Sequence, residues 1–501
     1  MQVVKRQEEM KMKPLSALYK SIDAILTAQS RHVTKKKAAN PIEDAEFICT
    51  PRAKGTTFSL GYSKEKILPD DIDKKKYYIA GYGENKPAKG VLDAPQTHAV
   101  WLDDLSGKGG IVLVSIDDVG MLNSDVNKLR ARLKDFAMLS GCRSINIVST
   151  HSHAGIDTMG IWGPLPLSGK DPKYMELVFS QTVKAVKDAY ANRKNGRLYL
   201  GRVEVPDMQE DIRTPIVYSK TLTRLRFVPD DGSKQTYIIN FASHSESLQG
   251  CNELVSADFP CYLREKILEE ADAETLYCVG AIGGMISMDI PDEQEIRKNG
   301  NDFSESTKRI GRQLADYALS IKEEDEILLN AKIGSITQEV YFKAENTILL
   351  IAAKAGILSA KEYRMPDKSG FAMKSEISYF EIDTLKILML PCEIFPELVY
   401  GGYLSADESA TGKGGEINPV PLKEIVGDDV MIIGLANDEL GYVLPPNDFL
   451  LNPEAPYFEN GRDHHDRKHY EETNSLGPGT AAKIAETVTK IISAVEKSKK
   501  M

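Results

Sequence analysis

The chain has 501 residues, of which 42% are hydrophobic and 27% are charged. This composition is ordinary for a globular protein and excludes a predominantly disordered chain. The 63 Lys and Arg residues are outnumbered by 73 Asp and Glu residues, so the formal net charge is −10. An acidic balance argues against a dedicated nucleic-acid binder, and we expect a small-molecule substrate as the partner.

No segment has the pattern of a membrane span or of a signal peptide. The most apolar run, residues 347–358, is short and contains Lys354, whereas a span needs about 20 apolar residues. The first residues are charged throughout and lack the apolar core of a secretory leader. We therefore expect a cytoplasmic protein without stable membrane insertion. The 6 cysteines form no CxxC pair, so neither a disulfide framework nor a zinc knuckle is indicated.

The sequence predicts one large domain after an N-terminal extension. Residues 1–50 are the extension, with a possible short helix around Leu15 to Ala28 and a solvated lysine run at residues 35–37. From about Phe58 to Val495 the sequence contains no linker rich in proline, glycine or serine and no repeat of fixed period, which indicates a single domain over residues 51–501. No pattern in the sequence decides the oligomeric state.

The first clear elements of this domain form a strand–helix–strand unit. Residues 110–117 are a continuous apolar run, as expected of a strand buried on both faces. Asn123 or Ser124 can cap the following helix, because both side chains can accept a backbone hydrogen bond. The apolar face of this helix contains Val126, Leu129, Leu133 and Phe136. Residues 144–150 form the next strand, which a right-handed crossover makes parallel to the first.

The same alternation continues toward the C-terminus. Asp171–Pro172 and Asp258 are good starts for two further helices. Additional short apolar strands are expected at residues 236–242, 276–280, 385–390 and 430–435. The pattern predicts an α/β fold with a large mixed, mostly parallel sheet flanked by helices. In such sheets the active site lies outside the carboxyl ends of the strands.

Metal-ligating side chains follow several of these strands. His151 and His153 come directly after residues 144–150, and being two apart they point the same way in an extended segment. His244 follows residues 236–242 and Glu393 follows residues 385–390. Imidazole and carboxylate groups are the ligands of catalytic zinc, which needs about three of them and an open position. The alternative is a set of hydrogen-bonded strand-end histidines and a surface glutamate.

Seven motifs in order resemble those of the neutral ceramidases, zinc-dependent amidases that split the N-acyl bond of ceramide. The matching segments are residues 150–155, 212–215, 240–244, 256–260, 391–393, 435–442 and 470–478. The resemblance extends over about residues 58 to 490. It implies that His151, His244, Glu393 and Tyr442 bind zinc, and that His153, Arg213 and Tyr470 line the reacting centre.

The resemblance also implies a mechanism. Zinc can polarise a carbonyl and lower the pKa of bound water to about 7. His153 is then a general acid or base, and Arg213 and Tyr470 stabilise the developing oxyanion. Asp117 or Asp118 either orients a ligand histidine or is a turn residue.

Three features depart from the family. Gly280 stands where the family has a catalytic serine, and Gly284 replaces an aspartate of the same segment. The chain ends soon after the last motif, so the small C-terminal β-domain of the ceramidases is expected to be absent. The third feature is the lack of a secretion signal. Together these features favour a small soluble substrate over ceramide.

The leading hypothesis is therefore a zinc-dependent hydrolase that cleaves a C–N amide bond. A zinc-dependent ester or lactone hydrolase, or a lyase acting on a sugar derivative, would use the same residues. The alternative outside enzymes is a catalytically silent binding protein on the same scaffold. The charged segment with His464, His465 and His469 is interpreted as a solvated loop beside the active-site mouth, although the spacing also permits a surface metal.

Overall fold

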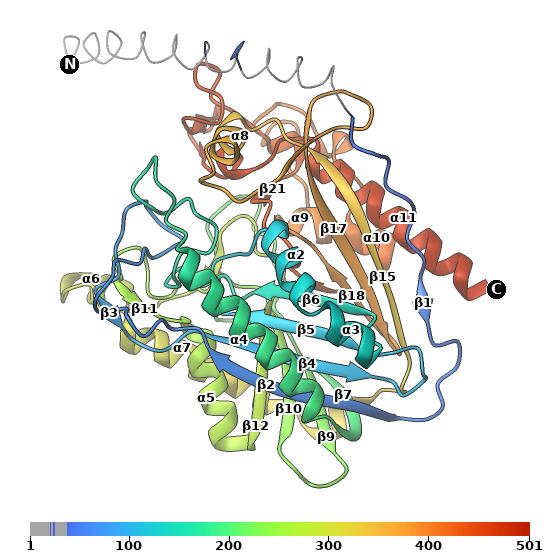
Figure 1. Ribbon diagram of the computed structural model, residues 1–501. Helices are drawn as coiled ribbons and strands as arrows, with labels where there is room; N and C mark the ends of the chain where they lie inside the picture. The colour runs from blue at the N-terminus through green and yellow to red at the C-terminus, as the bar shows by residue number, and fades with distance from the viewer. Residues whose placement is uncertain (1–20, 22–23, 26–37, 501) are drawn as a thin grey trace, which may run out of the picture.

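The computed structural model describes residues 21, 24–25 and 38–500 (Figure 1). The expected N-terminal helix and the lysines at residues 35–37 lie outside the described residues, apart from Ser21, Ala24 and Ile25, which are helical. Among the described residues, no helix is both long and apolar enough to cross a bilayer.

Two large β-sheets form the centre of the molecule. The first has nine strands: β12 (Ala273–Val279), β10 (Gln235–Phe241), β9 (Thr221–Pro229), β7 (Lys194–Glu204), β2 (Thr57–Lys66), β4 (Gln96–Asp103), β5 (Ile111–Ile116) and β6 (Ser144–Ser149) in spatial order, with β14 (Ile327–Leu328) beside β7. The second has six: β1 (Ile48–Cys49), β15 (Ile333–Lys343), β17 (Phe371–Ile382), β18 (Leu385–Met389) and β20 (Met431–Ile433), with β16 (Glu362–Arg364) beside β17.

Both sheets are mixed, and the prediction of a mostly parallel arrangement is wrong. Within them, β5–β6, β10–β12 and β18–β20 pair in parallel, and the other neighbours are antiparallel. The physical reason is the length of the connections. Only residues 230–234 join β9 to β10, and only residues 383–384 join β17 to β18. A parallel crossover needs a dozen residues or more, so these pairs must be antiparallel.

Short paired strands and helices complete the architecture. The four smaller ladders are β3 (Gly90–Val91) with β11 (Leu254–Val255), β8 (Gln209–Asp211) with β13 (Ile286–Met288), β19 (Glu393–Ile394) with β21 (Tyr442–Val443), and β22 (Gly461–Arg462) with β23 (Lys468–His469). The helices are α2 (Asn123–Arg132), α3 (Lys134–Ser140), α4 (Pro172–Ala191), α5 (Phe259–Ala271), α6 (Glu293–Lys298), α7 (Ser304–Ser320), α8 (Thr347–Lys354), α9 (Pro396–Tyr400), α10 (Leu422–Val426) and α11 (Thr480–Lys500). In Figure 1, α4 crosses the nine-stranded sheet and α11 lies along the six-stranded one.

The predicted helix starts are confirmed in two of three cases. The Asp171 carboxylate accepts from the backbone N–H groups of Lys173 and Tyr174, and Asp258 caps α5. The expected Asn123 or Ser124 cap of α2 is wrong, because Leu122 holds that position. A distant carboxylate replaces it: the Asn123 N–H donates to Asp438 Oδ1 at 2.7 Å.

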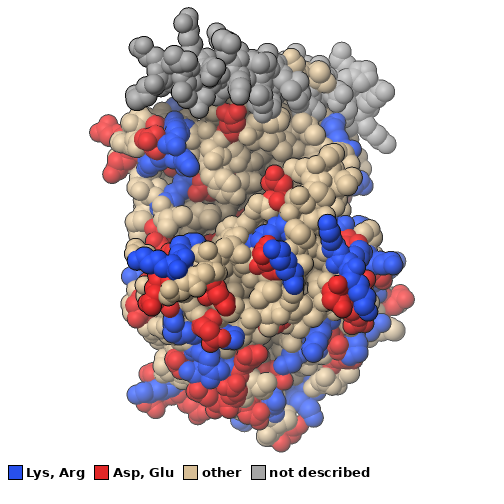
Figure 2. All heavy atoms as spheres, turned by 90° about the vertical axis from the view of Figure 1, so that its left-hand side faces the viewer, with Lys and Arg blue, Asp and Glu red and all other residues tan. Residues whose placement is uncertain are grey.

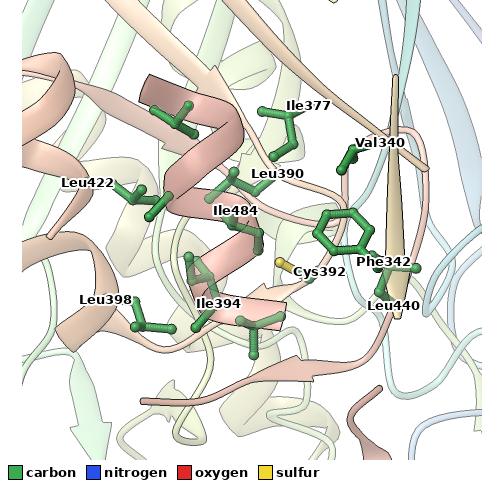
Figure 3. Packing of buried hydrophobic residues seen from close by; sticks show 14 of the residues in the cluster. Val340, Phe342, Ile377, Leu390, Cys392, Ile394, Leu398, Leu422, Leu440 and Ile484 are labelled. Carbon is green, nitrogen blue, oxygen red and sulfur yellow. The ribbon is translucent and has the colours of Figure 1, made fainter. Parts of the chain in front are cut away.

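An apolar cluster packed against α11 determines which way the Glu393 side chain points. Cys392 and Ile394 are buried in this cluster together with Ile484 of α11 (Figure 3). Successive side chains of a strand point to opposite faces. Glu393 therefore points away from the apolar cluster, and the burial of its two neighbours holds it there.

The surface agrees with the nearly balanced composition. On the face drawn in Figure 2, lysine and arginine side chains are interspersed with aspartate and glutamate, and the lower part is the more densely charged. Charges of mixed sign give no extended positive field on this face, unlike the basic stripe of a typical nucleic-acid binder.

Candidate metal centre

Three of the four residues predicted to bind zinc converge on one point. His151 follows β6, His244 follows β10, and Glu393 begins β19. The Glu393 Oε2 atom lies 3.0 Å from His244 Nε2 and 3.3 Å from His151 Nε2. All three side chains are buried. Burial raises the pKa of the Glu393 carboxyl, but the adjacent imidazoles of His151 and His244 lower it more, and the net pKa is well below its usual range.

The Nδ1 atoms of His151 and His244 are held by backbone carbonyls. His151 Nδ1 donates to Val119 O at 2.6 Å, and His244 Nδ1 donates to Ile286 O at 2.8 Å. A histidine that donates from Nδ1 keeps the Nε2 lone pair free, and metal-bound histidines are oriented in this way. In the structure, His244 Nε2 donates to the Glu393 carboxylate at 3.0 Å. A metal at the common point would take the place of that hydrogen and be held by both Nε2 atoms.

The junction of the two sheets brings these elements together. The Asn437 side chain, just after β20, accepts from the Ile147 N–H of β6 at 2.8 Å. In the parallel β19–β21 pair, Glu393 is in register with Tyr442. Ile147 and Asn437, which are 290 positions apart in the sequence, thus lie side by side.

His153 belongs to the same cluster. Its Nε2 atom lies 3.1 Å from His151 Nε2, and nitrogens of His151, His153 and His244 all lie within 4.8 Å of one another. These three histidines could hold a metal ion. Burial lowers the pKa of His153, although the Glu246 carboxylate 3.2 Å from its Nδ1 opposes that shift. A buried, neutral imidazole is the form that can accept a proton or bind a metal.

The two predicted tyrosines lie at the edge of the cluster. The Tyr442 hydroxyl donates to Met285 Sδ at 3.2 Å, and the ring centroids of Tyr442 and Tyr470 are 6.4 Å apart. Burial and the nearby Glu393 raise the pKa of Tyr442 well above its usual value. The same two causes raise the pKa of Tyr470 to about 12. Both hydroxyls are therefore protonated near neutral pH and can donate hydrogen bonds.

A cavity connects these groups. Its empty volume, including the open mouth, is about 760 Å³. The polar lining consists of His151, His153, Glu393, Glu439, Tyr442, Tyr470 and Asn474. Most of the remaining wall is apolar, with Trp162, Leu349 and Met373 among its residues. A mostly apolar wall with a few polar groups is typical of small-molecule sites.

Arg213 is not brought to this cavity. Its guanidinium pairs with Glu471, with Asp448 at 3.0 Å and with Glu472 at 3.3 Å. It also stacks over the Phe395 ring at 5.0 Å. Three carboxylates thus occupy the donors that the sequence analysis assigned to an oxyanion.

The two aspartates after β5 are not the partners of the ligand histidines. Asp117 accepts from Arg264 at 2.7 and 3.0 Å and lies 3.9 Å from His98. Asp118 is buried, and within the described part of the chain its carboxylate oxygens have no hydrogen-bond partner. Backbone carbonyls take the orienting role on His151 and His244. Sequence patterns do not reveal such carbonyls, because every residue has one.

The histidines of the charged segment do not form a common cluster. His464 and His465 are exposed, and the Nε2 atom of each donates to Asp407 O, at 3.2 and 3.0 Å. His469 is buried on β23, and its Nδ1 donates to Glu472 at 2.6 Å. The segment is a strand pair, so the spacing of four residues does not place His465 and His469 on one helical face.

Comparisons with known proteins show what the chain resembles in sequence and in fold. No family model matches the chain. A neutral ceramidase of Drosophila pseudoobscura pseudoobscura is 23% identical over 338 residues, which are 57% of this chain and 47% of that protein. The chain thus spans about half the length of this relative. The resemblance to the neutral ceramidase superfamily is confirmed.

Solved ceramidase structures share the fold. The neutral ceramidase from Pseudomonas aeruginosa superposes with a TM-score of 0.64 at 17% identity, covering 91% of this chain and 75% of that one. A structure described as ceramidase complexed with C2 gives a TM-score of 0.63 at 16% identity, covering 88% of this chain and 76% of that one. The mixed α/β architecture is therefore that of the ceramidase fold.

The glycines that depart from the ceramidase motif lie in a tightly packed segment after β12. The Gly280 N–H donates to Phe241 O at 3.1 Å. A Cβ atom added at Gly280 would lie 2.9 Å from Ala242 Cβ. Gly284 has a φ of +77°, a conformation that favours glycine. A side chain at either position would therefore require local adjustment.

Proposed function

We propose that the protein is a zinc-dependent hydrolase that cleaves the C–N amide bond of a small, soluble N-acylated substrate. The observation that carries the proposal is the convergence of His151 Nε2, His244 Nε2 and Glu393 Oε2, with His153 beside them, at the wall of a mostly apolar cavity. The likeness to neutral ceramidases supports amide cleavage as the reaction.

The donor set fits zinc. Two imidazole nitrogens and a carboxylate oxygen are the ligands of many catalytic zinc sites. We propose His151, His244, Glu393 and Tyr442 as the residues that hold it. When bound, zinc would polarise the amide carbonyl and lower the pKa of a water molecule to about 7.

The remaining residues of the chain handle the proton and the oxygen. His153 accepts a proton from the attacking water at Nε2 and returns it to the leaving nitrogen. The water oxygen forms the new bond to the acyl carbon, the C–N bond breaks, and the products are a carboxylic acid and an amine. The Tyr470 hydroxyl, 44% exposed and part of the lining, donates a hydrogen bond to the acyl oxygen.

Arg213 has a different role in this proposal. Its pairs with Glu471 and Glu472 hold the segment that follows Tyr470. Arg213 therefore keeps Tyr470 at the cavity without touching the substrate.

A combined metal and substrate test examines the proposal. Purified protein is analysed for zinc and assayed against N-acyl amino acids, N-acyl amines, matched esters and lactones, N-acyl sugars and a fluorescent long-chain ceramide. We expect about one zinc per chain, turnover of short N-acyl substrates and poor turnover of ceramide.

Each other outcome identifies an alternative. Turnover of esters or lactones without amides indicates an esterase or lactonase, and elimination products from sugar derivatives indicate a lyase. If the protein contains no zinc and turns over none of these substrates, it is a catalytically silent binding protein. His465→Ala, at an exposed histidine, is the matched control and should leave zinc and activity unchanged.

A further inference from the structure

Glu246 is a buried acidic residue beside the candidate metal centre that no sequence motif singles out. It follows His244 by two residues and is only 5% exposed. Its Oε2 atom lies 3.2 Å from His153 Nδ1. A buried carboxylate is costly unless its oxygens are partnered, so the contacts of Glu246 show what keeps it there.

Two hydroxyl groups fix the orientation of this carboxylate. The Tyr82 hydroxyl donates to Glu246 Oε2 at 2.8 Å, and the Ser287 hydroxyl donates to Glu246 Oε1. Ser287 lies on β13, whereas Tyr82 comes from the loop before β3. Because both oxygens are engaged from different parts of the chain, the carboxylate cannot turn away from His153.

The His153 ring is also confined by Gly81 and Tyr82. The Tyr82 ring meets it edge-on with centroids 5.1 Å apart. Gly81, with φ of +100°, packs so closely that an added Cβ would lie 2.4 Å from His153 Cγ. The backbone at Gly81 and the ring at Tyr82 thus leave the imidazole little freedom to rotate.

The three clustered histidines differ in what holds Nδ1. His151 and His244 donate hydrogen bonds to backbone carbonyls, whereas His153 Nδ1 lies 3.2 Å from the Glu246 carboxylate, a contact that is not aligned as a hydrogen bond. A carboxylate at Nδ1 keeps the proton on that nitrogen and leaves the Nε2 lone pair free. The His153 Nε2 atom lies in the cluster, 3.1 Å from His151 Nε2, and one of these two nitrogens donates a hydrogen bond to the other.

We propose that Glu246 is a positioning residue, which holds His153 in the Nδ1–H tautomer with Nε2 directed at the reacting water. The inference rests on the proposed function, because it assigns a task to the His153 imidazole of that site. Tyr82 and Ser287 act one step further out, by holding the carboxylate. The aspartate of the serine hydrolase triad has the same role, because it holds the catalytic histidine in the required tautomer and orientation.

The test compares Glu246→Gln and Glu246→Ala with the control Glu253→Gln, at a half-buried glutamate of the same loop that pairs with Lys89. Zinc content and kcat are measured for each. We expect Glu246→Ala to keep its zinc and lose about 10²–10⁴-fold in kcat, with KM little changed. Glu246→Gln retains an acceptor oxygen and should lose less. Glu246→Ala added to His153→Ala should cause no further loss, because the two residues act as one unit.

A second readout needs no substrate. The ring nitrogens of His153 are observed by ¹⁵N NMR in histidine-labelled protein, with His153→Ala used for assignment. We expect the Nδ1–H tautomer in the wild type and a tautomer mixture in Glu246→Ala. Should no amide be turned over by the wild type, the proposed function fails, but the ring signals still decide the role of Glu246.

Two results would overturn the inference. An unchanged tautomer in Glu246→Ala shows that the carboxylate does not position the ring. Loss of zinc in Glu246→Ala and in His153→Ala shows that His153 is a ligand and not the proton acceptor. If Glu246→Ala fails to fold, the nearly isosteric Glu246→Gln variant carries both readouts.

Discussion

The histidine cluster and the Arg213 network contrast in how their polar atoms are used. In the cluster, backbone carbonyls occupy Nδ1 of His151 and His244, while both Nε2 atoms converge on Glu393. In the network, Arg213 is surrounded by Asp448, Glu471 and Glu472, which neutralise it. Atoms that converge and remain available can bind a ligand, whereas atoms that satisfy one another stabilise the fold.

The largest effect should follow from breaking the cluster at its ligands. His151→Ala/His244→Ala removes two of the proposed donors, so we expect complete loss of zinc and of activity. The measurements are elemental analysis and turnover of the best N-acyl substrate, with His465→Ala as the control. Stoichiometric zinc in the double variant would refute this site assignment.

A change within the same cluster separates metal binding from proton transfer. His153→Ala should keep zinc and lose about 10²–10⁴-fold in kcat, because a general base is removed while the ligands remain. Zinc content is compared with kcat in the same preparation. Full activity with zinc retained would make His153 structural and Tyr470 the next candidate for the proton.

Breaking the Arg213 network should affect stability first. Arg213→Ala leaves three carboxylates without their buried partner, and such a loss costs roughly 3–5 kcal/mol. Denaturant unfolding should show this loss while zinc stays bound, because no proposed ligand is changed. Zinc loss from fully folded Arg213→Ala protein would contradict the division between the two regions.

A pH-dependent prediction concerns Asp118, which lies near the cluster but belongs to neither region. Burial raises the pKa of Asp118 from 3.8 to about 7. The folded protein therefore binds this proton more tightly than the unfolded chain, and the wild type loses stability as pH rises from about 4 to about 7. Asp118→Asn should lack this loss.

The test compares how the free energy of unfolding of the wild type and of Asp118→Asn changes with pH. The stability of Asp118→Asn relative to the wild type should rise by roughly 2–4 kcal/mol between pH 4 and pH 7. Denaturant unfolding at several pH values measures it. A pH-independent difference would show that Asp118 titrates normally in the folded protein.

The smallest effect is expected at Gly280. Gly280→Ser places a Cβ 2.9 Å from Ala242 Cβ, and overpacking of this kind costs about 1–3 kcal/mol. We expect a modest fall in Tm and no gain in hydrolysis of fluorescent ceramide. Ceramide turnover restored to the level of a neutral ceramidase would show that this one position limits the reaction.

Local patterns were sufficient for the strands that carry the histidines. The apolar runs at residues 110–117 and 144–150 predict β5 and β6 and their parallel pairing, which the structure confirms. His151, His153 and His244 were found because they directly follow such runs. The antiparallel strand β7 was missed, because its sequence is too polar to stand out as an apolar run.

The sequence by itself determined which residue types stand at the strand ends. A buried strand is a run of consecutive apolar residues, so the residue that follows it can be identified directly. The tertiary structure alone decided which atoms those residues face. Val119 O and Ile286 O orient two histidines, Glu246 faces the third, and Glu471 takes Arg213 away from the cavity. Val119 is 32 positions from its partner and Glu471 is 258. Contacts at such separations depend on how the strands pair and how the two sheets meet, and no local pattern encodes that packing.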